Sequence, residues 1–183
     1  FLSKYNDNPH IAIPKLIETG YLKLDYLNNR RKTYKISRKD SIVIAPTNFI
    51  AFPELSIESY LEELISLLID KTKYNIVYRP HPSNRNHSKT LKIIKKFETH
   101  KKFFFDNSSD YFESYLKSNC MITDLSGTAY TYAFFVKQPV IFFSKNENLI
   151  KKLNYHELSC FKDRDKIGLI TKNTDQVLNT INN

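Results

Sequence analysis

The sequence is poor in the residues that mark several common protein classes. Its 183 residues include three glycines, one methionine, two cysteines and no tryptophan. Cys120 and Cys160 form at most one disulfide and follow no metal-ligand spacing, which argues against a disulfide-rich secreted domain and against a structural metal site. No apolar run approaches the roughly 18 residues that cross a bilayer, so no transmembrane helix is expected. We therefore predict a reduced, cytoplasmic protein.

Familiar catalytic motifs are also missing. The chain has no Walker phosphate-binding loop and no G-x-S-x-G nucleophile turn, and its histidines form no H-x-x-x-H pattern. We therefore expect neither a cofactor nor a metal ion. Positive charge, in contrast, is abundant: 28 Lys and Arg face 19 Asp and Glu, a net charge of +9. Such a charge favours anionic partners, which include nucleotides, polyphosphates, nucleic acid and anionic membrane surfaces.

Short apolar runs alternate with helix-like segments from residue 41 onward. Five runs have the length of buried strands, namely residues 41–46, 74–78, 102–106, 120–123 and 139–143. Six segments have helical character, namely residues 56–71, 88–97, 111–117, 128–136, 146–152 and 175–181. The alternation predicts an α/β fold, a Rossmann-like parallel sheet of at least five strands with helices on both faces.

The composition changes near residue 40. Residues 1–40 are polar and basic with only short apolar pieces. We interpret them as a connector or as the remnant of a preceding N-terminal domain. Residues 41–183 form the predicted Rossmann-like domain.

The second predicted strand ends abruptly in Arg79-Pro80-His81-Pro82. In parallel sheets, ligands bind outside the carboxyl ends of the strands. The two prolines restrict the backbone on either side of His81, so its imidazole is held in a rigid turn. A guanidinium beside a preset imidazole suits a phosphate group. The alternative interpretation is an ordinary loop histidine.

The fourth predicted strand ends in Asp124-Leu125-Ser126-Gly127-Thr128, just before a helix. Free backbone N–H groups at a helix start, together with the Ser126 and Thr128 hydroxyls, can bind an anion, and Gly127 allows its close approach. Asp124 is expected to orient the loop through backbone hydrogen bonds. An ordinary helix cap is the alternative. Thr47, Asn107 and Ser108 follow two other strands at the same edge, and we add them to the candidate phosphate-binding residues.

Five segments, in order, resemble the CDP-glycerol glycerophosphotransferase family of teichoic acid and capsule polymer synthesis. Residues 20–27 are similar to its "TGYPRxDxL" segment, residues 44–47 to "YAPTxR", residues 79–82 to "xxHP", residues 109–127 to "DxxxxL…LITDYSS" and residues 137–143 to "xKPVIFY". The match extends over roughly residues 19–145. Three positions differ: Leu22 replaces a proline, Leu125 a tyrosine and Gly127 a serine.

The resemblance implies a GT-B architecture of two Rossmann-like domains, with this chain as the C-terminal, donor-binding one. It implies transfer of glycerol phosphate, or a related polyol phosphate, from a CDP-activated donor to a hydroxyl of a polymer or lipid-linked acceptor. His81 would contact the pyrophosphate and assist departure of CMP. Ser126, Gly127 and Thr128 would hold the phosphates, and Arg79 would add charge. The base for the acceptor would lie in the other domain, so this chain should bind without turnover. The full-length protein would be peripheral at the inner face of the cell membrane.

Three other interpretations stay open. A GT-B glycosyltransferase of capsule synthesis that uses a nucleotide sugar is compatible with the differences at Leu125 and Gly127. A non-catalytic nucleic-acid- or nucleotide-binding domain is suggested by the charge and the aromatic residues. A degenerate nucleotide-binding domain that serves only as a scaffold of a synthesis complex is a further possibility. The sequence contains no strand of interleaved basic and aromatic residues of the RNP type, so we expect no nucleic-acid partner.

Overall fold

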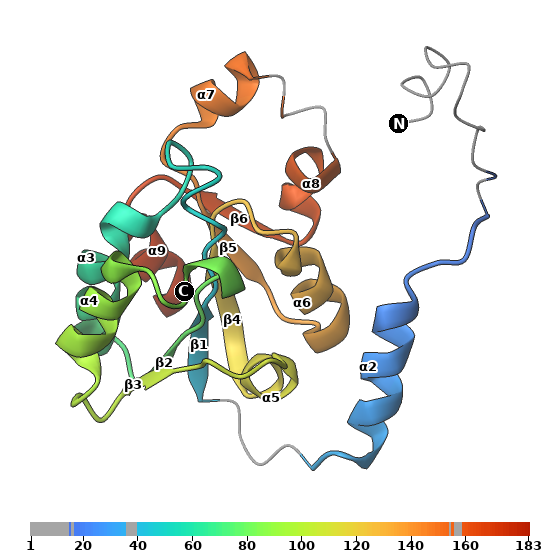
Figure 1. Ribbon diagram of the computed structural model, residues 1–183, viewed down its shortest axis with the longest axis horizontal. Helices are drawn as coiled ribbons and strands as arrows, with labels where there is room; N and C mark the ends of the chain where they lie inside the picture. Colours follow the sequence, from blue (N-terminus) through green and yellow to red (C-terminus); the bar gives the residue numbers. More distant parts are fainter. Residues whose placement is uncertain (1–14, 16, 36–39, 154, 156–158) are drawn as a thin grey trace.

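The computed structural model describes residues 15, 17–35, 40–153, 155 and 159–183 (Figure 1). Six parallel strands form one sheet in the order β3-β2-β1-β4-β5-β6. They are β1 (Ser41–Ile44), β2 (Asn75–Tyr78), β3 (Phe103–Phe105), β4 (Ser118–Thr123), β5 (Val140–Phe143) and β6 (Gly168–Thr171). The first five confirm the predicted strands and the α/β class. Because the chain first moves outward from β1 and then returns to β4, the strand order reverses between these two central strands.

Helices α3 (Leu61–Lys71), α4 (Ser88–Phe97) and α9 (Thr174–Asn182) cover one face of the sheet (Figure 1). Their apolar side chains pack against Ile42 and Ile44 of β1, while Val43 between them belongs to the core on the opposite face. This alternation follows from the strand geometry, in which successive side chains point to opposite faces. All four residues of β1 are buried, which explains its continuous apolar sequence.

Helices α2 (Leu22–Thr33), α5 (Phe112–Leu116) and α6 (Thr128–Val136) lie on the other face (Figure 1). Leu27 of α2 is 2% exposed and belongs to the core beneath these helices. Arg31 of α2 donates a 3.0 Å hydrogen bond to the carbonyl of Phe135 in α6. The segment that we interpreted as a connector therefore contributes a helix to this domain. Its residues 1–14, 16 and 36–39 lie outside the described part of the chain.

Shorter elements complete the fold. They are η1 (Glu58–Tyr60), η2 (Pro82–Asn84), α7 (Glu147–Lys152), α8 (Ser159–Lys162) and η4 (Arg164–Lys166). Arg164 holds α7 with two hydrogen bonds, 2.9 and 2.8 Å long, to the carboxylate of Glu147. Within the described residues, no helix is both long and apolar enough to cross a membrane.

Strand β6 forms an edge of the sheet and was not predicted from the sequence. It starts at Gly168, where a Cβ atom would come within 1.9 Å of the carbonyl oxygen of Val140 in β5. Leu169 and Ile170 are 61% and 40% exposed. Because its two apolar side chains lie outside the core, β6 depends on backbone pairing with β5 and on the close approach that Gly168 allows.

Candidate functional site

A cavity of about 290 Å³ opens at the carboxyl ends of β1, β2 and β4, where the strand order reverses. We call it the His81 cavity. It is lined by Lys23, Ala45, Pro46, Arg79, Pro80, His81, Pro82, Ser109, Tyr111, Tyr115, Ser126 and Thr128. These residues come from α2, from the loops after four strands, from α5 and from the start of α6. The position is the one at which open parallel sheets bind ligands.

His81 lies on the wall of this cavity, directly after β2. Its Nδ1 accepts a 3.2 Å hydrogen bond from the backbone N–H of Ser83, and Pro82 begins the short helix η2. In a neutral imidazole whose Nδ1 accepts, the proton is on Nε2. His81 therefore has one N–H available as a hydrogen-bond donor, and the turn that holds it is fixed by proline and by its own cap.

Thr128, the first residue of α6, and Ser126, two residues before the helix, line the same cavity. The first N–H groups of a helix have no acceptor within the helix and can bind an anion, although that of Ala129 donates here to the carbonyl of Ser126 at 3.0 Å. Gly127, the residue before the helix, has an ordinary φ of −59°, and a Cβ atom there would meet nothing within 4 Å. Neither backbone conformation nor packing requires glycine at this position. The hydroxyl of Thr128 lies 2.6 Å from that of Tyr115, which orients it.

Asp124 lies beneath the cavity and is completely buried. Its Oδ1 accepts hydrogen bonds from the backbone N–H groups of Thr47 at 2.8 Å and Leu125 at 2.6 Å. Its Oδ2 accepts one from Ile57 at 3.0 Å. Burial raises the pKa of Asp124, and these hydrogen bonds oppose the rise. The carboxylate thus ties together the loops after β1 and β4.

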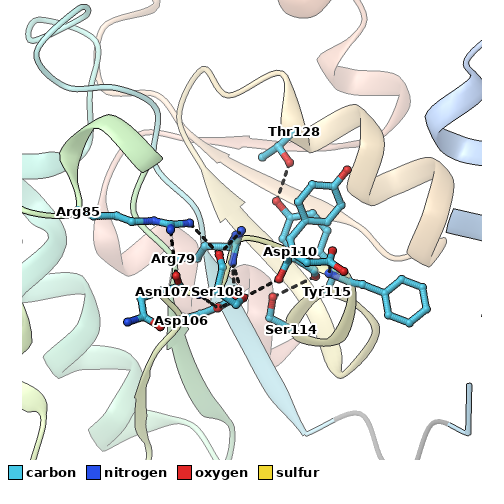
Figure 2. Close-up of polar contacts among 11 residues, drawn as sticks. Arg79, Arg85, Asp106, Asn107, Ser108, Asp110, Ser114, Tyr115 and Thr128 are labelled. Carbon is cyan, nitrogen blue, oxygen red and sulfur yellow. Dashed lines mark hydrogen bonds and ion pairs between the residues drawn. The ribbon is translucent and has the colours of Figure 1, made fainter. Parts of the chain in front are cut away.

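Arg79 is buried and its charge is paired (Figure 2). Its Nη1 donates to Oδ2 of Asp106 at 2.7 Å, and its Nη2 donates to the carbonyl of Ser108 at 3.1 Å. Burial raises the pKa of Asp106, but hydrogen bonds from Ser108, Ser114 and Arg79 outweigh it and hold that pKa below its usual value. Arg79 lines the cavity, but most of its hydrogen-bonding capacity is used to order the loop after β3.

A second arginine completes this loop clamp, which consists of Arg79, Arg85 and Asp106. Arg85 donates to the carbonyls of Asn107 at 2.9 Å and Ser108 at 2.8 Å (Figure 2). Asn107 and Ser108, which were candidates for phosphate binding, do not line the His81 cavity, and neither do Thr47, Asp124 and Gly127. The structure brings together His81, Arg79, Ser126 and Thr128, and it places the other candidates around or beneath them.

Sequence reasoning missed three residues of the cavity: Lys23, Tyr111 and Tyr115. The rings of Tyr111 and Tyr115 stack with their centroids 4.5 Å apart, and Nζ of Lys23 lies 4.7 Å from the centroid of Tyr111. Lys23 occupies the place of the arginine in the "TGYPRxDxL" segment that residues 20–27 resemble. That position was the available signal, and it was overlooked because residues 1–40 were interpreted as a connector.

A larger cavity of about 560 Å³ runs along β1, β2 and β3 beside α5. Four carboxylates line it, those of Asp40, Asp106, Asp110 and Glu113, against the two cations of Arg30 and Lys117. This excess of negative charge disfavours a phosphate ligand. The His81 cavity contains no carboxylate among its lining residues, so it is the better candidate for binding an anion.

Metal and thiol chemistry have little support in the described part of the chain. No group of three or more His, Cys, Asp or Glu side chains there could hold a metal ion. Cys120 is free and buried, and burial raises the pKa of its thiol to about 12. A thiol in this state is not a nucleophile at neutral pH.

Known structures share this fold. The wall teichoic acid polymerase TagF, in the form soaked with CDPG, matches with a TM-score of 0.53 and 24% identity, over 87% of this chain and 35% of TagF. The UDP-GlcNAc 2-epimerase of Methanocaldococcus jannaschii matches with a TM-score of 0.53 and 12% identity, over 89% of this chain and 42% of the epimerase. At these identities the likeness shows the fold, a Rossmann-like domain of the GT-B type.

Sequence comparisons identify the family. Over 88 residues the chain is 34% identical to the minor teichoic acid biosynthesis protein GgaB of Bacillus subtilis (strain 168), an alignment that covers 48% of this chain and 9% of GgaB. The chain thus corresponds to a small part of that relative. The sequence profile described as CDP-Glycerol:Poly(glycerophosphate) glycerophosphotransferase matches residues 7–179. The chain belongs to this glycerophosphotransferase family, as its motifs predicted.

Proposed function

We propose that this chain is the C-terminal, donor-binding part of a transferase that moves glycerol phosphate, or a related polyol phosphate, from a CDP-activated donor to a hydroxyl of a cell-surface polymer. Its membership of the family supports this function. The observation that carries it is the His81 cavity, in which a preset imidazole and the first turn of a helix line one opening at the reversal of strand order.

The proposed reaction is a phosphoryl transfer. The acceptor oxygen attacks the phosphorus that carries the glycerol, and the bond from this phosphorus to the oxygen of CMP breaks. The acceptor proton passes to a base, and CMP leaves with the bonding electrons. Catalysis of such a reaction consists largely of positioning and of stabilising charge on the phosphate oxygens.

His81 would donate its Nε2–H to the phosphate oxygen that becomes part of CMP. The hydrogen bond between its Nδ1 and Ser83 keeps the donor on Nε2 and fixes the ring. Ser126, Thr128 and the free N–H groups at the start of α6 would hold the remaining phosphate oxygens. Since no carboxylate lines the cavity, the base for the acceptor is expected from another domain of the full-length protein.

Calorimetric titration of the chain with CDP tests the role of His81. His81→Ala should weaken binding by about 1–3 kcal/mol, because it removes a hydrogen bond to a charged group. Ser126→Ala should weaken it less, because the N–H groups of the same turn remain. His100→Ala is the matched control, since its Nδ1 also accepts a backbone N–H at 3.2 Å, from Lys102, outside the cavity.

The identity of the donor is tested by titration with CDP, CMP, UDP and GDP. A preference for the cytidine nucleotides is expected. Equal or absent binding of all four would contradict the proposal. A clear preference for UDP would instead favour a glycosyltransferase that uses a nucleotide sugar, the interpretation that Leu125 and Gly127 left open.

We also propose that the full-length protein works in the cytoplasm at the inner face of the cell membrane, where a polymer or lipid-linked acceptor is available. The net charge of +9 supports attraction to an anionic surface. The full-length protein should sediment with phosphatidylglycerol vesicles and not with phosphatidylcholine vesicles. Added salt should release it from the phosphatidylglycerol vesicles. Equal binding to both lipids would contradict this placement.

A further inference from the structure

The positive charge of the His81 cavity is unevenly available to a ligand. Three basic side chains line the cavity: Lys23, Arg79 and His81. The guanidinium of Arg79 is neutralised by Asp106 at 2.7 Å. His81 offers one donor, since its Nδ1 already accepts the N–H of Ser83. Among these three side chains, Lys23 therefore supplies the one full positive charge that no carboxylate of the described residues neutralises and that a phosphate can contact.

Lys23 is exposed, and within the described residues no carboxylate lies within 4.0 Å of its ammonium group. Asp110, whose charge it feels, is already paired with Arg30. The side chain of Tyr111 raises the pKa of Lys23, so the ammonium group is charged at neutral pH. Its nearest described aromatic contact is the ring of Tyr111, at 4.7 Å. The group is thus both charged and accessible.

The backbone of Lys23 is held in place on both sides. Tyr21, two residues earlier, places its hydroxyl 2.8 Å from Oγ1 of Thr131 in α6. Leu27, one turn later, is buried in the core. Helix α2 is therefore anchored to α6, the same helix whose first turn borders the cavity. An ammonium group on a fixed helix can act as a positioned charge, although its own stem is flexible.

We propose that Lys23 binds the phosphates of the nucleotide donor and supplies the main unpaired charge of the His81 cavity, an inference that rests on the proposed donor-binding function. Its consequence is that the donor site takes a ligand-binding side chain from α2, outside residues 41–183. The occupant is a nucleoside diphosphate rather than a neutral nucleoside, because a point charge adds affinity only for the anionic part.

The test compares Lys23→Met and Lys23→Arg with the unchanged chain in titrations with CDP at low and high salt. Lys23→Met keeps an aliphatic stem over Tyr111 and removes the charge, so CDP affinity should fall about tenfold or more. Its affinity should also depend less on salt than that of the unchanged chain. Lys23→Arg should restore most of the affinity and the salt dependence.

Lys32→Met is the matched control, because it removes the same charge from the exposed, opposite end of α2. Among the described residues, Lys32 hydrogen-bonds only Asn29 of its own helix, and its loss should leave CDP binding unchanged. Thermal unfolding of each variant separates lost binding from lost folding. If the unchanged chain binds no CDP, the proposed function itself fails. If it binds CDP and Lys23→Met binds equally well with the same salt dependence, the role of Lys23 fails and the donor site stands.

Discussion

Gly127 and Gly168 have opposite surroundings, although each lies at the start of a secondary-structure element, α6 and β6 respectively. The space where a Cβ of Gly127 would lie is open, whereas a Cβ of Gly168 would overlap the carbonyl of Val140. Glycine at 168 is thus explained by close packing of two strands. Glycine at 127 has no such explanation within the protein, and a ligand that approaches the turn closely would provide one.

Alanine substitution should therefore affect the two positions differently. Gly168→Ala should lower the free energy of unfolding by about 1–3 kcal/mol, because β5 and β6 must separate. Gly127→Ala should leave it unchanged or raise it by about 0.4–1 kcal/mol, yet weaken CDP binding. Chemical denaturation and calorimetry measure the two effects. Unaltered CDP affinity in Gly127→Ala would show that no phosphate approaches this turn.

The ion pair of Asp106 and Arg79 should make stability depend on pH. The pKa of Asp106 is lower in the folded chain than its usual value of about 3.9. Its contribution is therefore fully present above that value and is lost as the pH falls through the lower, folded pKa. At neutral pH, Asp106→Asn should cost about 3 kcal/mol, because the charge of the buried Arg79 loses its partner.

Chemical denaturation of the unchanged chain and of Asp106→Asn, repeated from pH 7 to pH 3, measures how the ion pair contributes to stability at each pH. The difference between the unchanged chain and Asp106→Asn should shrink as the pH falls below about 4. Glu113→Gln, which breaks an exposed pair with Lys117, should change stability little at any pH. If the two proteins differed in free energy of unfolding by the same amount at every pH from 7 to 3, the pH dependence could not be assigned to the carboxylate of Asp106.

At the scale of elements, α2 tests where the folded domain begins. Leu27 is 2% exposed, whereas its neighbour Tyr26 is 63% exposed. Leu27→Ala should lower the free energy of unfolding by about 2–4 kcal/mol through the cavity that it leaves. Tyr26→Ala should have a small effect. Equal effects of the two substitutions would mean that α2 contributes nothing to the stability of the sheet.

The elements that the sequence predicted are those whose apolar residues enter the core. Residues 88–97 and 128–136 form helices within the predicted limits, and the first five strands were found from their apolar runs. Helix α2 and strand β6 were not predicted from the sequence, and the reason is the same for both. α2 buries one residue, and β6 exposes Leu169 and Ile170, so neither has a periodic apolar pattern. Both elements are stabilised by tertiary contacts, and sequence patterns do not reveal such contacts.

The candidate site was predicted in its position more fully than in its composition. The rule that ligands bind at the carboxyl ends of parallel strands located the loops of His81 and Ser126. It could not distinguish a free side chain from a paired one. Arg79 and Ser108 were equal candidates in sequence, and only the fold shows that Asp106 engages both. Lys23 lies 58 residues before His81, in a segment without strands, so strand ends could not reveal it.

For the whole molecule, binding and turnover should separate. The cavity contains the groups that we propose bind phosphate, His81 among them, but no carboxylate lines it that could deprotonate an acceptor. The chain should therefore bind CDP and release no CMP from CDP-glycerol in the presence of an acceptor. Chromatography of CMP measures turnover, with the full-length protein as the positive control. Release of CMP by this chain at the rate of the full-length protein would contradict the proposal that another domain supplies the base.

The exposed edge formed by β6 has a consequence for the protein in solution. Among the described residues, no strand pairs with the outer side of β6, and the β6 side chains of Leu169 and Ile170 are exposed. Two chains can join their sheets at such an edge. Sedimentation velocity should thus reveal self-association that grows with protein concentration, and Leu169→Lys should suppress it. A dimer that persists in Leu169→Lys would require another contact surface. Titrations made at low concentration, below this association, will report on the nucleotide alone.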